Sequence, residues 1–194
     1  MHMADALISP TVGGAMWAAS LGLAGYSAHK VAKELPERKV PLMGVLGAFV
    51  FAAQMLNFPV AAGTSGHLLG GALVAILLGP WAGMLVMTTV VGLQALIYQD
   101  GGLLALGANV LNMAVVGVLV GHLTYSLLRR LLKKGRLALY AGGFAAAWLS
   151  VVVASLAAAV ELAASGVVPL GLALPAMGGV HALIGAGEGL ITVG

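Results

Sequence analysis

The chain has 194 residues, of which 61% are hydrophobic and 8% are charged, and its formal net charge is +3. A water-soluble domain normally carries about 25% charged residues, so this composition indicates a membrane protein and excludes soluble enzymes, nucleic-acid-binding domains and disordered tails. The chain has no cysteine, which excludes disulfide frameworks and thiolate metal sites. Any bound metal must therefore be held by nitrogen or oxygen atoms.

Four long stretches of the sequence contain no Asp, Glu, Lys or Arg, and they cover residues 40–99, 101–128, 137–160 and 162–187. A transmembrane helix needs about 20 apolar residues, so each stretch can cross a membrane and the first can cross it several times. All nine basic residues lie in two clusters, at 30–39 and 129–136. Basic loops mark the cytoplasmic side, so we expect both clusters inside, and nucleic-acid binding is the weaker interpretation.

Glycine, proline and polar breaks divide these stretches into helices. The breaks predict seven helical segments, at residues 11–29, 41–56, 67–79, 80–98, 103–128, 137–165 and 176–193. Segment 67–79 is short for a full span, so we expect it to be buried among other helices or to stop below the surface. Residues 57–66, 99–102 and 166–175 then form outer connections. The predicted fold is an all-α, polytopic bundle, a single domain over residues 1–194, with its amino terminus outside and its carboxyl terminus inside.

The amino terminus does not have the composition of a signal peptide. Residues 1–5 contain no basic residue, and no small-residue cleavage site follows the apolar stretch. Because His2 is too large for the peptidase that removes initiator methionine, we expect Met1 to be retained with a free α-amine. That amine, the His2 amide nitrogen after metal-promoted deprotonation and a His2 imidazole nitrogen can occupy three corners of a square. Ni²⁺ and Cu²⁺ prefer such a planar nitrogen field.

The fourth corner of this square needs another neutral imidazole on the outer side. The predicted topology places His67 there, at the junction of the outer loop and the third segment, whereas His29 and His122 lie towards the cytoplasm. Residues 1–10 are therefore expected to form a metal-binding loop at the outer end of the bundle.

Several sequence blocks resemble the CbiM/NikM family, the substrate-binding membrane components of energy-coupling-factor cobalt and nickel transporters. The opening block Met1–Pro10 reads MHMADALISP, beside MHIPDGFLSP in the family. The further blocks are Gly63–Ala72, Leu78–Gly83, Gln99–Gly102, Gly107–Met113 and Gly179–Gly189. The resemblance covers essentially the whole chain, and its first two blocks are the specific ones.

The resemblance implies an ATP-driven uptake transporter for Ni²⁺ or Co²⁺ in which this chain binds the metal as transported substrate. It also implies that the amino terminus folds into the bundle and that Met1, His2 and His67 hold the metal, in agreement with the chelate argument. Four residues between positions 3 and 7 differ from the bulkier or more rigid residues of the family's opening. These departures leave the path of the loop less defined but remove no metal donor.

Other polar residues near the proposed ligands have alternative interpretations. We expect Ser65 to lie beside the metal site. Asp5 either accepts a hydrogen bond from a ligand imidazole or caps a helix and anchors the loop, and we favour the second interpretation. Asn109 either lines the metal pocket or, like Gln94 and Asn112, bonds across helices or to the backbone.

Ionisable residues inside a membrane are functional candidates by default. His181 and Glu188 are seven residues apart, which places them on one helical face. For both, a buried structural hydrogen bond is at least as good an interpretation. Glu161 is expected to face the outer surface or a partner within the bundle.

Small residues repeat every four positions on the first helix, including Gly14, Ala18 and Gly22. Such faces let another helix approach closely, either within this chain or from a partner. The resemblance implies docking of a transmembrane coupling component that is linked to cytoplasmic ATPases, and it leaves room for a small accessory membrane subunit. The chain has no GxxxxGK[ST] phosphate loop, so it is not expected to be an enzyme itself. We expect it in the cell membrane of a prokaryote, surrounded by lipid.

Two other classes of function are alternatives to metal binding for an ATP-driven transporter. A stand-alone secondary transporter or channel needs a coupling carboxylate near the midplane of the membrane, and Glu188 is the candidate. An intramembrane enzyme is the weakest interpretation, because HExxH is absent and Ser65-Gly66-His67 has no acid at a convincing spacing.

Overall fold

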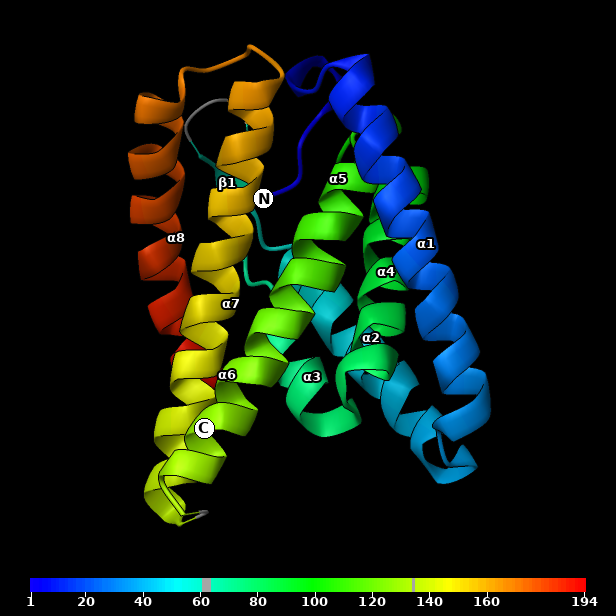
Figure 1. Cartoon of the computed structure of the whole chain (residues 1–194), viewed down its shortest axis with the longest axis vertical. Coiled ribbons are helices and arrows are strands. Elements are labelled where there is room, and N and C mark those ends of the chain that lie inside the picture. Colours follow the sequence, from blue (N-terminus) through cyan, green and yellow to red (C-terminus); the bar gives the residue numbers. More distant parts are fainter. Residues whose placement is uncertain (61–63, 134) are drawn as a thin grey trace.

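The computed structural model describes residues 1–60, 64–133 and 135–194. Residues 61–63 of the predicted outer loop, and Lys134 of the second basic cluster, lie outside the described residues. Within the described ranges the fold is a bundle of seven helical segments with one short two-stranded ribbon (Figure 1). The all-α prediction is confirmed.

The elements follow one another in the order of the predicted segments. The helices are α1 (Pro10–Glu34), α2 (Val40–Gln54), α3 (Gly71–Leu78), α4 (Pro80–Tyr98), α5 (Leu106–Val110), α6 (Gly117–Leu131), α7 (Arg136–Ala164) and α8 (Leu170–Val193). A π-helical stretch, Leu111–Val116, joins α5 to α6 without a break, so these two form one segment. The ribbon pairs β1 (Phe58–Pro59) with β2 (Ser65–Gly66) in antiparallel register. Short 3-10 turns occupy Asp5–Leu7 and Glu37–Lys39.

The outer surface of the bundle is suited to lipid. Among the described residues, four helices are long and apolar enough to cross a membrane: Pro80–Tyr98, Leu106–Leu131, Arg136–Ala164 and Leu170–Val193. Large apolar side chains such as Leu96, Leu183 and Leu190 point outwards and are about two-thirds exposed or more. Outward apolar side chains over long helices are what a multi-pass membrane protein requires.

Two helix starts follow from local sequence. The Ser9 hydroxyl accepts a hydrogen bond from the Val12 amide and caps α1, and Pro10 occupies the first turn, where its missing N–H costs nothing. Pro80 starts α4 in the same way. The preceding Gly79 has φ +90°, a conformation that favours glycine and separates α3 from α4.

The predicted start of the last helix was wrong. Pro175 predicts a break before residue 176, but α8 begins at Leu170, directly after Pro169. Pro175 is the sixth residue of α8, so it removes only the hydrogen bond to the carbonyl of Gly171, an exposed residue. A proline this close to a helix start is tolerated. The first helix also continues past the predicted residue 29, to Glu34.

The small-residue face of α1 does not pack inside this chain. Gly13, Ser20 and Ser27 are the buried residues of α1. Gly14, Ala18 and Gly22 are exposed, and a Cβ atom added at either glycine would meet nothing within 4 Å. The interpretation of this face as internal packing is therefore wrong.

The third segment, α3, is buried in the middle of the bundle as expected. It spans only Gly71–Leu78 and lies against α4, α6 and α7 (Figure 1). Gly121 of α6 permits this packing, because a Cβ atom there would lie 2.7 Å from the Ala72 Cα. The loop that precedes α3 is therefore held deep inside the molecule, and this loop carries His67.

The two basic loops, α1–α2 and α6–α7, lie at the same end of the bundle (Figure 1). We predict that a cysteine at Glu37 is labelled by an impermeant maleimide from the cytoplasm alone, and one at Val167 from outside alone, because basic loops stay inside. Both positions are exposed, and the chain has no cysteine of its own to interfere. Labelling of both positions from the same side would contradict the predicted topology.

Candidate metal centre

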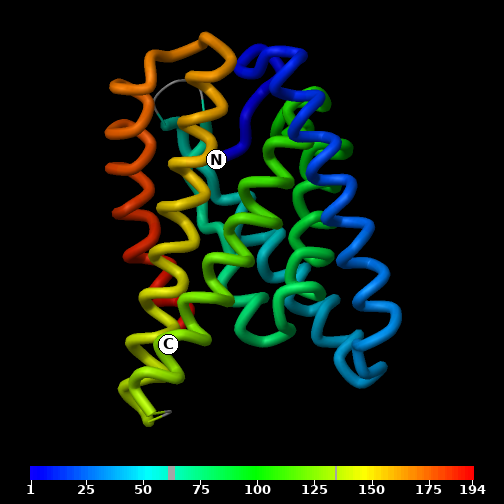
Figure 2. Tube along the Cα trace, viewed as in Figure 1, coloured from blue at the N-terminus to red at the C-terminus, as the bar shows by residue number. Residues whose placement is uncertain are grey.

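The amino-terminal segment turns back from the start of α1 and enters the interior of the bundle (Figure 2). Met1, His2 and Met3 are only 1%, 4% and 0% exposed. Asn109 fixes the backbone of Met3, because its Oδ1 accepts from the Met3 amide at 2.9 Å and its Nδ2 donates to the Met3 carbonyl at 3.1 Å. The Gly102 amide also donates to that carbonyl. Asn109 thus positions the segment and bonds to backbone, the second of the two predicted interpretations.

The α-amine of Met1 lies against Ser65 in strand β2. The amine donates to the Ser65 carbonyl and, at 3.3 Å, to the Ser65 hydroxyl. The same hydroxyl accepts from the His2 amide at 3.2 Å. Ser65 therefore contacts both backbone nitrogens that the chelate would use.

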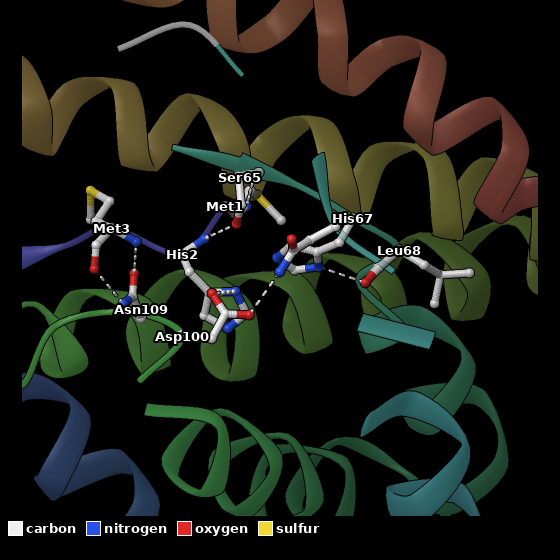
Figure 3. Close-up of polar contacts among 9 residues, drawn as sticks. Met1, His2, Met3, Ser65, His67, Leu68, Asp100 and Asn109 are labelled. Atoms are coloured by element: carbon white, nitrogen blue, oxygen red, sulfur yellow. Dashed lines mark hydrogen bonds and ion pairs between the residues drawn. The ribbon is translucent and has the colours of Figure 1, made fainter. Parts of the chain in front are cut away.

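The imidazoles of His2 and His67 stack against each other, with ring centroids 4.7 Å apart and ring planes inclined by 29° (Figure 3). His67 Nδ1 lies 2.8 Å from the carbonyl oxygen of Leu68. A carbonyl only accepts, so Nδ1 carries the proton and the Nε2 lone pair is free. Both ring nitrogens of His2 and Nε2 of His67 are buried without a hydrogen-bond partner among the described residues.

Burial keeps these nitrogens neutral. Desolvation lowers the pKa of the Met1 amine from 8.0 to about 4, although the negative charge of Asp100 opposes the shift. Desolvation, reinforced by the nearby amine, lowers the pKa of His2 from 6.5 to about 3. The pKa of His67 also lies well below 6.5, mainly through burial. Neutral amines and imidazoles are the protonation states that bind metal ions.

Asp100 is a member of the pocket to which the sequence analysis gave no role. Its Oδ1 lies 3.5 Å from Nδ1 of His2, and its Oδ2 accepts from Asn57 Nδ2 at 3.0 Å. Asp100 lies in the turn between α4 and α5, inside the block Gln99–Gly102. The resemblance of this block to the family is the sequence signal that could have pointed to Asp100. In the structure its carboxylate lies beside the nitrogens where a cation would bind.

Asp5 anchors the loop and does not reach an imidazole ligand. Its Oδ1 accepts from the Ala105 amide at 3.0 Å, one residue before α5 begins. The favoured interpretation of Asp5 is confirmed. Gly102 makes room for this anchor, because a Cβ atom at residue 102 would lie 1.9 Å from Asp5 Oδ1.

The arrangement differs from a site built from side chains alone. In the described part of the chain, no three His, Cys, Asp or Glu side chains are grouped so that they could hold a metal ion. The nitrogens gathered at Met1, His2 and His67 include backbone atoms. The four donors of the predicted square therefore include the amine and one amide.

Asn112, His181 and Glu188 have structural partners. Neither side-chain polar atom of Gln94 has a hydrogen-bond partner among the described residues, so its expected bond across helices or to backbone is not seen. Asn112 Nδ2 donates to Glu161 Oε2 at 2.6 Å, which confirms the expected partner for Glu161 within the bundle. His181 Nδ1 lies 2.8 Å from the Met177 carbonyl oxygen, and its Nε2 has no hydrogen-bond partner among the described residues. Glu188 accepts from two backbone amides, as the structural interpretation expected.

A family model and several known proteins match this chain over most or all of its length. The family model described as cobalt uptake substrate-specific transmembrane region matches residues 2–194. The fused nickel transport protein NikMN of Rhodobacter capsulatus is 36% identical over 209 residues, which cover all of this chain and 60% of that protein. The cobalt transport protein CbiM of Acetohalobium arabaticum is 35% identical over 146 residues, 73% of this chain and 58% of that protein. The matches thus span about three fifths of these relatives.

Two solved structures share the fold. A crystal structure of a truncated transition metal transporter superposes with a TM-score of 0.92 at 33% identity, covering 99% of this chain and 94% of that one. A second crystal structure of a transition metal transporter gives a TM-score of 0.91, also at 33% identity, over 99% of this chain and 89% of that one.

Proposed function

The chain belongs to the family of cobalt uptake substrate-specific transmembrane regions, and from this premise we propose that it binds Ni²⁺, or Co²⁺, as the substrate of an ATP-driven energy-coupling-factor uptake transporter. The proposed ligands are the Met1 amine, the amide and imidazole nitrogens of His2, and Nε2 of His67. The match over residues 2–194 and the geometry of the buried amino terminus support this proposal.

One observation carries the proposal: Nδ1 of His2 and Nε2 of His67, the two imidazole nitrogens of the proposed ligand set, are buried together without a hydrogen-bond partner among the described residues. Leaving a buried polar atom unpaired costs about 1–3 kcal/mol. A metal ion bound by these nitrogens offsets that cost, and the Asp100 carboxylate beside them adds a favourable charge.

The donor set favours one metal chemistry. Because the His2 amide and Nδ1 belong to the same residue, both can bind one ion in a six-membered chelate ring. The Met1 amine and the His2 amide close a five-membered ring on the other side. Four nitrogens in a plane suit Ni²⁺, and Cu²⁺ would bind at least as tightly by intrinsic affinity, so selection in the cell would rest on geometry and metal availability.

The alternative, a stand-alone secondary transporter or channel, has less support. It would require a carboxylate that is free to exchange a coupling ion. Both oxygens of Glu188 accept hydrogen bonds from backbone amides, and Glu161 accepts from Asn112. Uptake by proteoliposomes that contain this chain alone would favour the alternative.

We further propose that a transmembrane coupling component docks on the exposed small-residue face of α1 around Gly14, Ala18 and Gly22, since a neighbouring helix can approach such a face closely. Cytoplasmic ATPases bound to that component would hydrolyse ATP, and a small accessory membrane subunit could complete the complex. The assembly would lie in the cell membrane.

The test of the proposed function is His67→Ala. We expect the purified protein to bind Ni²⁺ and to show the absorption of planar, diamagnetic Ni²⁺. The substitution leaves the three donors of Met1 and His2 and admits water to the fourth corner. The affinity should fall at least tenfold, or about 1.4 kcal/mol, when measured by titration with absorption spectra.

His122→Ala is the matched control for this test, because His122 lies in α6 outside the pocket. It should leave affinity and spectrum unchanged. Unchanged affinity in His67→Ala would remove His67 from the site.

A further inference from the structure

Glu188, near the carboxyl end of α8, reaches into the loop that carries His67. Its Oε2 accepts from the Leu69 amide at 2.5 Å and its Oε1 accepts from the Gly70 amide at 2.8 Å. Glu188 is 2% exposed, and it lies 118 positions after Gly70 along the chain. One side chain therefore holds two consecutive backbone amides directly beyond His67.

The same loop is also held by Gln54, at the end of α2. Gln54 is fully buried, and its Nε2 donates to the Leu69 carbonyl at 2.6 Å. Gly70 has φ +80° and packs on Val50, since a Cβ atom there would lie 2.7 Å from a Val50 methyl group. Both polar groups of the Leu69 backbone are thus fixed by buried side chains of two different helices.

Glu188 and Gln54 together form a clamp on the backbone of Leu69 and Gly70. This clamp affects the direction of the His67 lone pair. His67 Nδ1 is bonded to the carbonyl oxygen of Leu68, so the path of the backbone at residue 68 sets the plane of the ring and the direction of Nε2. Leu68 lies between His67 and the clamped Leu69. A metal ligand must be held within about 0.5 Å of its productive position, which requires support of this kind.

We propose that Glu188 is a positioning residue that fixes His67 for metal binding and so ties the geometry of the metal site to the position of helix α8. This inference rests on the proposed function. Within the described part of the chain, the hydrogen bonds of Glu188 go to Leu69 and Gly70 and to none of the three proposed ligand residues, so Glu188 acts through the backbone. A displacement of α8 would move the His67 imidazole.

Glu188→Gln tests this role with little change in shape. The carboxamide keeps one acceptor oxygen, but its NH₂ group then faces a backbone N–H, so one of the two hydrogen bonds is lost. We expect the dissociation constant for Ni²⁺ to rise at least tenfold and the planar Ni²⁺ absorption to weaken as His67 leaves the fourth corner. Helicity and melting temperature are measured on the same samples.

The matched control is Glu161→Gln, which alters another buried carboxylate whose recorded partner is Asn112 in the joined α5–α6 segment. It should leave affinity and spectrum as in the unmodified protein. Gln54→Leu removes the other side chain that holds Leu69, and it is the alternative variant if Glu188→Gln does not fold. It should weaken Ni²⁺ binding in the same direction, with the same loss of planar absorption.

A double-mutant cycle separates positioning from a general effect on structure. In a protein that already carries His67→Ala, Glu188→Gln should change the dissociation constant by less than twofold, because no imidazole is left to position. Equal weakening with and without His67, or native affinity and spectrum in Glu188→Gln, would overturn the role of Glu188. Absence of Ni²⁺ binding by the unmodified protein would instead overturn the proposed function itself.

Discussion

Blocking the Met1 amine is expected to lower the affinity for Ni²⁺ at least a hundredfold. Acetylation, or one alanine placed before Met1, converts the amine into an amide and removes the donor that closes the five-membered chelate ring. The added atoms must also fit a pocket in which Met1 is 1% exposed. Overpacking of this kind typically costs about 1–3 kcal/mol, so donor loss and crowding act together. Affinity is measured by titration with Ni²⁺.

The control for this experiment is one alanine added after Gly194, which should leave binding unchanged. Circular dichroism and melting curves show whether the blocked protein keeps its bundle, since crowding alone could unfold the amino-terminal segment. A folded, blocked protein with native affinity and spectrum would exclude the amine as a ligand. The site would then have to be rebuilt from side chains.

A fall in pH from 7.5 to 5.5 is expected to weaken Ni²⁺ binding roughly a hundredfold, about tenfold per pH unit. Burial lowers the pKa of the Met1 amine to about 4 and that of His2 to about 3, so both are already neutral over this range. The proton displaced on binding is then the one from the His2 amide, which gives one decade per pH unit. An exposed amine and imidazole, with pKa values of 8.0 and 6.5, would give a steeper dependence.

The same pKa shifts set the sign of a second effect of pH. The Met1 amine and the His2 imidazole bind protons more readily when residues 1–3 are released from the bundle into water. Packing of residues 1–3 in the bundle is therefore favoured at high pH and weakens as pH falls through 8.0 towards 4. The dependence of affinity on pH should therefore steepen as pH approaches 4. Titrations at several pH values, with a free Met-His peptide as reference, measure both slopes. Equal slopes in peptide and protein would contradict the buried, neutral pocket.

The order and type of the helices could be predicted from the sequence because each helix is a local apolar stretch that ends at glycine, proline or polar residues. The short, buried α3 follows from its length and from the glycines and Pro80 around it. Pro175 led to the wrong predicted start of α8, because a proline near a helix start is tolerated whereas one in the interior disrupts the helix. Sequence pattern alone does not separate these two positions.

The residues of the candidate site could be predicted only in part. Met1, His2 and His67 follow from donor chemistry and from the resemblance of the first two blocks. The part played by Asp100 could not be foreseen, because its distance of 3.5 Å to His2 arises from the meeting of two loops 98 positions apart. The contacts of Glu188 join segments that are still further apart in the sequence, and no local pattern records them.

Docking of residues 1–3 sets an order of events during synthesis of the chain. The groups that hold these residues belong to Ser65 and Asn109, up to 106 positions later in the chain, and are therefore made after them. Residues 1–3 therefore stay undocked until β2 and α5, which carry these groups, have been made and packed. Until then Met1 is open to solvent, whereas in the finished fold it is 1% exposed and covered by the helices that follow it.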